Sequence, residues 1–147
     1  MESKLIVGSL EKCDLPDLKI QNLPIRIDTG AKTSSLHVDN LTPFTKNDEH
    51  WIRFDIHPDI HKVENIISCE SIVHDQRTIK SSNGTSEARY VIQTLFCLGS
   101  QSWPIQITLT NRSDMSYLML FGREGMGDKL LVDPSQEYLM DDINHTV

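Results

Sequence analysis

The chain has 147 residues, a hydrophobic content of 38% and a formal net charge of −7 at neutral pH. This length suits one domain, 1–147, with a core of its own. The negative charge disfavours nonspecific binding to nucleic acid, which needs a basic field. No apolar run approaches the ~18 residues of a membrane span, and the N-terminus has no apolar region of signal-peptide length. We therefore expect a cytoplasmic protein, unless a signal peptide has been removed.

Most of the chain is patterned as short strands. Alternation of apolar and polar residues, or β-branched runs, predicts strands within 4–11, 18–28, 50–57, 64–75, 77–99, 102–111 and 117–122. Short helices are predicted in only two segments, 122–131 and Thr33 to Leu36. Many short strands joined by tight turns predict an all-β protein, either a sandwich or a closed barrel.

Two turn signals separate the later strands. Asn83-Gly84 is the strongest short hairpin signal, and Gly99-Ser100 marks a second hairpin. The first hairpin has a polar tip flanked by Arg77 and Arg89. Long polar hairpins are commonly exposed loops, but they also serve as lids over clefts.

The stretch IRIDTGAKTSSLHV, 25–38, ends an alternating strand on Asp28 and follows it at once with Thr29 and Gly30. Alone, Asp-Thr-Gly is a weak motif that suits any turn. About ninety residues later, however, the chain has LMLFGR, 118–123, in which Gly122 lies within a run expected to be buried. A glycine at each point lets two backbone segments approach closely. Together these two elements are typical of an aspartic protease lobe.

The sequence resembles the retropepsin-like aspartic peptidases, and more closely the small bacterial and archaeal family labelled ATP-dependent zinc proteases. The matching pieces are VGSLEKCDLPDL, RIDTGAKTSSLHV, RTIKSSNGTSEARYVIQT, ITLTNRSDMSYLMLFGREGM and LLVDPSQEYL, which span nearly the whole chain. The resemblance implies a closed acid-protease barrel with one or two short helices, and Asp28, Thr29 and Gly30 as the catalytic motif. The chain departs from the family at Phe121, where leucine is usual.

Aspartic proteolysis needs two carboxylates that share one proton across a bound water. This chain has one Asp-Thr-Gly and lacks the ~300 residues of a two-lobed enzyme. A homodimer with twofold symmetry would supply the second Asp28. The alternative is a non-catalytic module on the same fold that binds an extended peptide by strand addition. An obligate monomer in solution would favour that alternative.

Basic residues cluster in the segments expected to surround the site. We expect substrate contacts from Ala31, Lys32, Arg77, Asn83, Gly84, Arg89 and Arg123. A cleft lined by one sign of charge attracts ligands of the other sign. The expected substrates are therefore acidic peptides, with oligoglutamate as a candidate because genes of this family often lie beside glutamate ligases. Alternatively, Arg123 and Arg89 make internal contacts that hold the dimer together or hold the hairpin around Asn83-Gly84, a candidate flap over the site, in place.

The sequence shows no credible cofactor site. His57 and His61 are four residues apart, but the pair lacks the glutamate of a helical zinc motif, and Pro58 stands between them. Ser34 and Ser35 have no nucleophile elbow around them, so we expect them to bond local backbone or the Asp28 carboxylate. The glycine-rich 122–127 has no Walker lysine. Cys13, Cys69 and Cys97 are too widely spaced for a disulfide framework or a metal pair, and are expected to be ordinary thiols.

Overall fold

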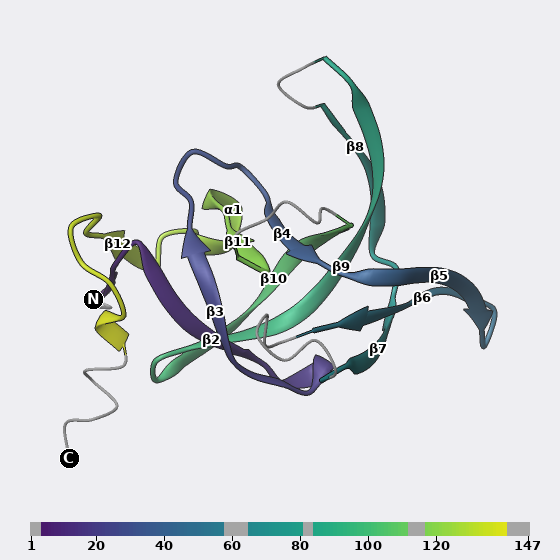
Figure 1. The fold of residues 1–147 in the computed structure, drawn as a ribbon, viewed down its shortest axis with the longest axis horizontal. Coiled ribbons are helices and arrows are strands. Elements are labelled where there is room, and N and C mark those ends of the chain that lie inside the picture. The colour runs from purple at the N-terminus through teal and green to yellow at the C-terminus, as the bar shows by residue number, and fades with distance from the viewer. Residues whose placement is uncertain (1–3, 58–64, 81–83, 112–116, 141–147) are drawn as a thin grey trace.

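The structure is a computed structural model that describes residues 4–57, 65–80, 84–111 and 117–140. Strands dominate it (Figure 1). The strands are β1 (Leu5–Val7), β2 (Leu10–Leu15), β3 (Ile20–Ile27), β4 (Ser34–His37), β5 (Asp39–Lys46), β6 (Glu49–Ile56), β7 (Ile67–Ile72), β8 (Asp75–Lys80), β9 (Ser86–Leu98), β10 (Gln101–Thr110), β11 (Met119–Phe121) and β12 (Leu130–Val132). The helices are the 3-10 turn η1 (Pro16–Leu18) and the short α1 (Arg123–Met126).

Six strands close into a barrel in the order β10-β4-β11-β3-β2-β9, and the pairing of β9 with β10 completes the ring. β8 extends this sheet from β9. β3 runs parallel to β11, and β4 runs parallel to β10. This arrangement brings the end of β3, where Asp28 follows, beside the end of β11. The predicted all-β closed barrel is therefore confirmed.

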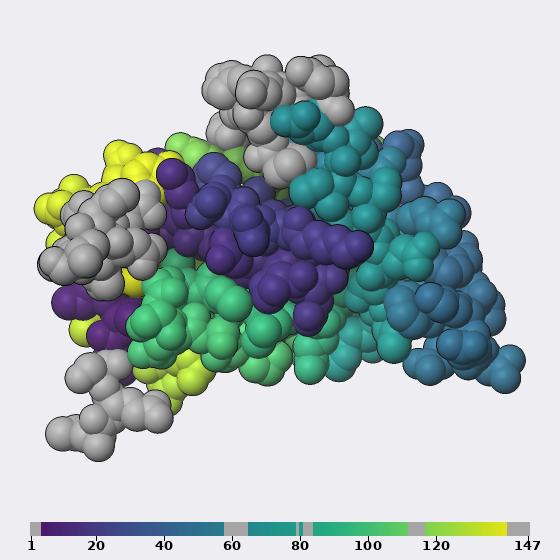
Figure 2. Space-filling view, turned by 90° about the horizontal axis from the view of Figure 1, so that it is seen from below, coloured from purple at the N-terminus to yellow at the C-terminus, as the bar shows by residue number. Residues whose placement is uncertain are grey.

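A second sheet lies outside the barrel. β5, β6 and β7 form an antiparallel three-stranded sheet between β4 and the β8–β9 hairpin. It occupies one end of the molecule, opposite the end where 130–140 lie (Figure 2). Ile52, Phe54 and Ile56 of β6 are fully buried and join the same hydrophobic core as the barrel. The sheet is thus packed against the barrel by every second residue of its central strand.

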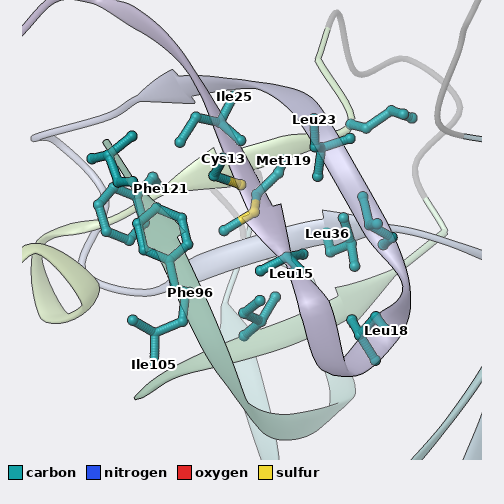
Figure 3. Close-up of a cluster of buried hydrophobic side chains, with 14 of the residues drawn as sticks. Cys13, Leu15, Leu18, Leu23, Ile25, Leu36, Phe96, Ile105, Met119 and Phe121 are labelled. Carbon is teal, nitrogen blue, oxygen red and sulfur yellow. The ribbon is translucent and has the colours of Figure 1, made fainter. Parts of the chain in front are cut away.

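The core follows from the period-two pattern of the barrel strands. Ile25, Leu36, Phe96, Met119 and Phe121 are all completely buried (Figure 3). The rings of Phe96 and Phe121 stack with their centroids 4.4 Å apart. Phe121 therefore has an aromatic packing partner in Phe96, and a leucine at 121 would make a less complete contact with that ring.

Both predicted hairpins are present, and their glycines have the backbone geometry that tight turns need. Gly84 has a φ of 89° and Gly99 a φ of 60°. Neighbouring Asn83 lies outside the described residues. The expectation of a helix from Thr33 to Leu36 is wrong: β4 begins at Ser34 and pairs with β10 and β11. Pairing on both sides outweighs the weak local preference of its serines.

The segment 4–11, expected as one strand, is two. β1 pairs with β12, whereas β2 enters the barrel, and the break falls at Gly8 and Ser9. A β-carbon on Gly8 would lie 2.3 Å from the carbonyl oxygen of Gln136.

None of the helices in the described part of the chain is long and apolar enough to cross a membrane.

Candidate active site

Asp28 is held at the end of β3 by its backbone. Its amide donates to the carbonyl oxygen of Phe121 over 2.9 Å, which continues the pairing of β3 with β11. The chain then turns: the amide of Gly30 donates to Oδ1 of Asp28 at 3.1 Å, and the amide of Ala31 donates to the carbonyl oxygen of Asp28 at 3.2 Å. Asp28 is half-buried, and Thr29 and Gly30 are exposed. The turn therefore presents one carboxylate at the surface.

Gly122 lets the segment after β11 pass directly beneath this loop. A β-carbon at this position would lie 2.6 Å from the backbone carbon and oxygen of Thr33. The Gly122 amide donates to Oγ of Ser34 at 3.0 Å. Ser34 thus bonds backbone 88 residues away, not the local backbone or the Asp28 carboxylate as the sequence led us to expect. No local signal could reveal a contact of that separation.

The start of α1 braces the loop at three further points. The amide of Arg123 donates to the carbonyl oxygen of Ala31 at 2.9 Å, and the amide of Glu124 donates to that of Lys32 at 3.0 Å. The guanidinium of Arg123 donates through Nη1 to the carbonyl oxygen of Thr29 at 2.9 Å. Arg123 therefore has an internal role in positioning the loop that carries Asp28. Lys32 is exposed beside this loop.

The β8–β9 hairpin projects from the barrel on the same side as the β3–β4 loop in the view of Figure 1. Arg77 and Arg89 are opposite each other in its register. Each is paired within its own strand: Nε of Arg77 lies 3.2 Å from Oδ2 of Asp75, and Nε of Arg89 lies 3.2 Å from Oε2 of Glu87. The two predicted substrate-binding arginines therefore already have carboxylate partners. Of the two turn residues Asn83 and Gly84, only Gly84 is among the described residues.

Of the two histidines that the sequence analysis rejected as a zinc site, His57 is described and His61 lies outside the described residues. Nε2 of His57 contacts Oδ2 of Asp39 at 3.1 Å, at the start of β5. In the part of the chain that the structure describes, no three His, Cys, Asp or Glu side chains are grouped so that they could hold a metal ion.

The three cysteines are free. Burial raises the pKa of the Cys69 thiol to about 11, and raises the pKa of Cys13 further. A thiol that stays protonated at neutral pH is a poor nucleophile. Cys13 and Cys69 therefore behave as packing residues, in keeping with the expectation of ordinary thiols.

A closed barrel that presents an Asp-Thr-Gly turn against a glycine of a second buried strand defines a retropepsin-like fold. A family model described as the retropepsin-like aspartic endopeptidase RimB matches residues 6–142. The chain belongs to this RimB-like family.

The comparison also finds relatives and a solved structure. The chain is 47% identical over 139 residues to a probable alpha-L-glutamate ligase of Shewanella pealeana, and 45% identical over 143 residues to one of Parasynechococcus marenigrum. These alignments cover 95% and 97% of this chain, but the chain spans only about 30% of the length of either relative. A Legionella pneumophila protein of unknown function has a similar crystal structure, with a TM-score of 0.79 and 30% identity. That match covers 94% of this chain and 99% of the other.

Proposed function

We propose that this protein is an aspartic endopeptidase that acts as a homodimer, with one Asp28 from each subunit. The observation that carries the proposal is the position of Asp28, held by backbone hydrogen bonds at a surface turn. The RimB-like family match supports the same chemistry. Each chain contributes half of the required carboxylate pair, so twofold symmetry would complete it.

In the proposed reaction the two Asp28 carboxyl groups share one proton, because two like charges at such short range cannot both ionise. The ionised carboxylate takes a proton from the bound water, and the water oxygen attacks the scissile carbonyl carbon. The protonated carboxyl gives its proton to the carbonyl oxygen. As the tetrahedral intermediate collapses, the carboxyl that took the water proton gives it to the leaving nitrogen and the C–N bond breaks. The other carboxylate takes a proton from one hydroxyl of the intermediate as the new C=O bond forms. Both carboxyl groups end the cycle sharing one proton, as they began it.

The proposal includes a preference for acidic peptides, with oligoglutamate as the candidate substrate. Exposed Lys32 follows the catalytic turn directly. The relatives named alpha-L-glutamate ligases contain a region like this chain within a polypeptide about three times as long. A peptidase joined to a ligase that adds glutamate would be suited to removing the added glutamate.

The free cysteines fit a reducing compartment, so the proposal also includes a cytoplasmic location.

A cleavage assay on synthetic peptides tests this function. Peptides carrying a run of glutamates should be cut by the wild-type protein, and mass spectrometry of the products gives the cleaved bond. Asp28→Asn should abolish cleavage, because an amide cannot share a proton with the second carboxylate. The amide oxygen can still accept the Gly30 hydrogen bond, so the variant should fold. Turnover equal to wild type in that variant would remove Asp28 from the mechanism.

The alternative, a peptide-binding module on the same fold, predicts a different result. Sedimentation of the wild-type protein would then show a monomer at the concentrations of the assay. Peptides would bind without being cut, and Asp28→Asn would bind them equally well.

A further inference from the structure

The β8–β9 hairpin has two chemically different faces. Side chains alternate between faces along a strand, and cross-strand partners share a face. On β9, Ile92 and Phe96 belong to the barrel core, and Tyr90 packs against it. We call the face of the hairpin on the same side as these core-facing side chains the inner flap face. Its residues are Gln76, Thr78, Lys80, Ser86, Ala88 and Tyr90.

The opposite, outer face carries most of the charge of the hairpin. Arg77 and Arg89 lie there with their partners Asp75 and Glu87. Arg77 also donates to Oε1 of Gln106, which lies on β10 between the core residues at 105 and 107 and so points away from the barrel interior. The side chain of Arg89 is only 12% exposed. These contacts hold both arginines away from the inner flap face.

Lys80 is the only charged residue of the inner flap face. It is the last residue of β8, is exposed, and is opposite Ser86. None of the other five residues named for this face is acidic, so the side chain adds a positive field to the face. The loop that carries Asp28 contributes a second exposed lysine, Lys32. The two lysines come from the β8–β9 hairpin and the β3–β4 loop, which project on the same side of the barrel in the view of Figure 1.

We propose that Lys80 is a specificity-determining residue that, together with Lys32, binds carboxylate side chains of the substrate. This inference rests on the proposed peptidase function and replaces Arg77 and Arg89 as the residues of the hairpin that recognise acidic peptides. Lysine suits a flexible chain of carboxylates, because its ammonium group binds as a point charge without the fixed fork of arginine.

Binding measured without turnover tests the role of Lys80 separately from the chemistry. In an Asp28→Asn background, fluorescence anisotropy with a labelled octaglutamate peptide gives the Kd, and labelled octaglutamine is the neutral comparison. Lys80→Gln should weaken octaglutamate binding about two- to five-fold, the upper range of one exposed ion pair. It should leave octaglutamine binding unchanged. Lys80→Arg should restore most of the affinity, because it restores the charge.

The matched control is Lys46→Gln, which removes an equal charge from β5 of the second sheet, where Lys46 lies over the ring of Trp51. Its octaglutamate affinity should equal that of the parent. The difference between parent and Lys80→Gln should shrink as salt is added. Equal octaglutamate affinity in parent and Lys80→Gln, or an equal loss in Lys46→Gln, would overturn the assignment of Lys80. The cleavage assay with Asp28→Asn judges the peptidase itself, so the two failures can be told apart.

Discussion

Arg123 donates a hydrogen bond through Nη1 to the carbonyl oxygen of Thr29, across 94 residues of sequence. This bond joins the segment after β11 to the exposed part of the loop that carries Asp28. The same segment binds the loop through the amides of Arg123 and Glu124. The turn that carries Asp28 is therefore held by three hydrogen bonds from the start of α1, and such contacts keep a reactive group in one position.

Arg123→Lys should lower kcat and leave KM nearly unchanged. Lysine retains the charge but cannot reproduce the planar guanidinium contact, and a small shift of Asp28 would cost about ten- to hundred-fold in rate. Steady-state kinetics on both an acidic and a neutral peptide would check this. If Arg123 instead bound substrate carboxylates, its loss would raise KM for the acidic peptide alone.

Gly122→Ala should destabilise the protein by about 1–3 kcal/mol, the usual cost of overpacking a close contact. The added methyl group would meet backbone atoms of Thr33 at 2.6 Å. Urea denaturation gives the free energy of unfolding, and cleavage should be lost as the loop is displaced. Gly127→Ala is the comparison, because its methyl group meets no atom within 4 Å. Its φ of 54° imposes backbone strain alone, so it should remain active; activity lost equally in both variants would contradict the steric explanation.

Glu11→Gln should lower the free energy of unfolding by about 1–3 kcal/mol, the cost of leaving a buried donor unpaired. Glu11 is completely buried, and its carboxylate accepts from the amides of Gly8, Leu139 and Met140 at 2.8, 2.9 and 3.1 Å. An amide side chain would turn an NH2 group toward one of these donors. Exposed Glu49→Gln is the control. Matching denaturation midpoints for the two variants would mean that the carboxylate does not anchor the C-terminal segment.

Asp55→Asn should destabilise the protein at neutral pH and have less effect in acid. Hydrogen bonds from Asn40 and Ser68 to the Asp55 carboxylate, each 2.8 Å long, hold its pKa below the usual value. A carboxyl whose pKa is lower in the folded state stabilises the fold above its unfolded pKa, and loses this contribution as the pH falls through the folded value. Thermal unfolding of both proteins from pH 7 down to acid would test this. A Tm difference that stays constant with pH would contradict it.

EDTA should leave peptide cleavage unchanged. The two Asp28 carboxyl groups would activate water by proton transfer, which requires no Lewis acid. Turnover is measured before and after dialysis against the chelator. Loss of cleavage that zinc then restores would show that the reaction depends on a metal.

Much of this protein could be predicted from local sequence. Alternating side chains such as Ile25 and Ile27 indicated the barrel strands, because burial of one sheet face imposes a period of two. Asp28-Thr29-Gly30 marked the turn that we propose to be catalytic. Glycine at 84 and 99 marked both hairpins, because tight turns need backbone angles that few other residues adopt.

Tertiary structure decided what depends on partners distant in sequence. Ser34 lies in a strand rather than a helix because β10 and β11 pair with its strand, β4, from both sides, and its hydroxyl binds Gly122. Arg123 supports the loop because β3 and β11 run side by side. The register of the hairpin places Arg77 and Arg89 on one face and Lys80 on the other. Composition shows how many cations the chain has, but only strand pairing sets the side to which each one points.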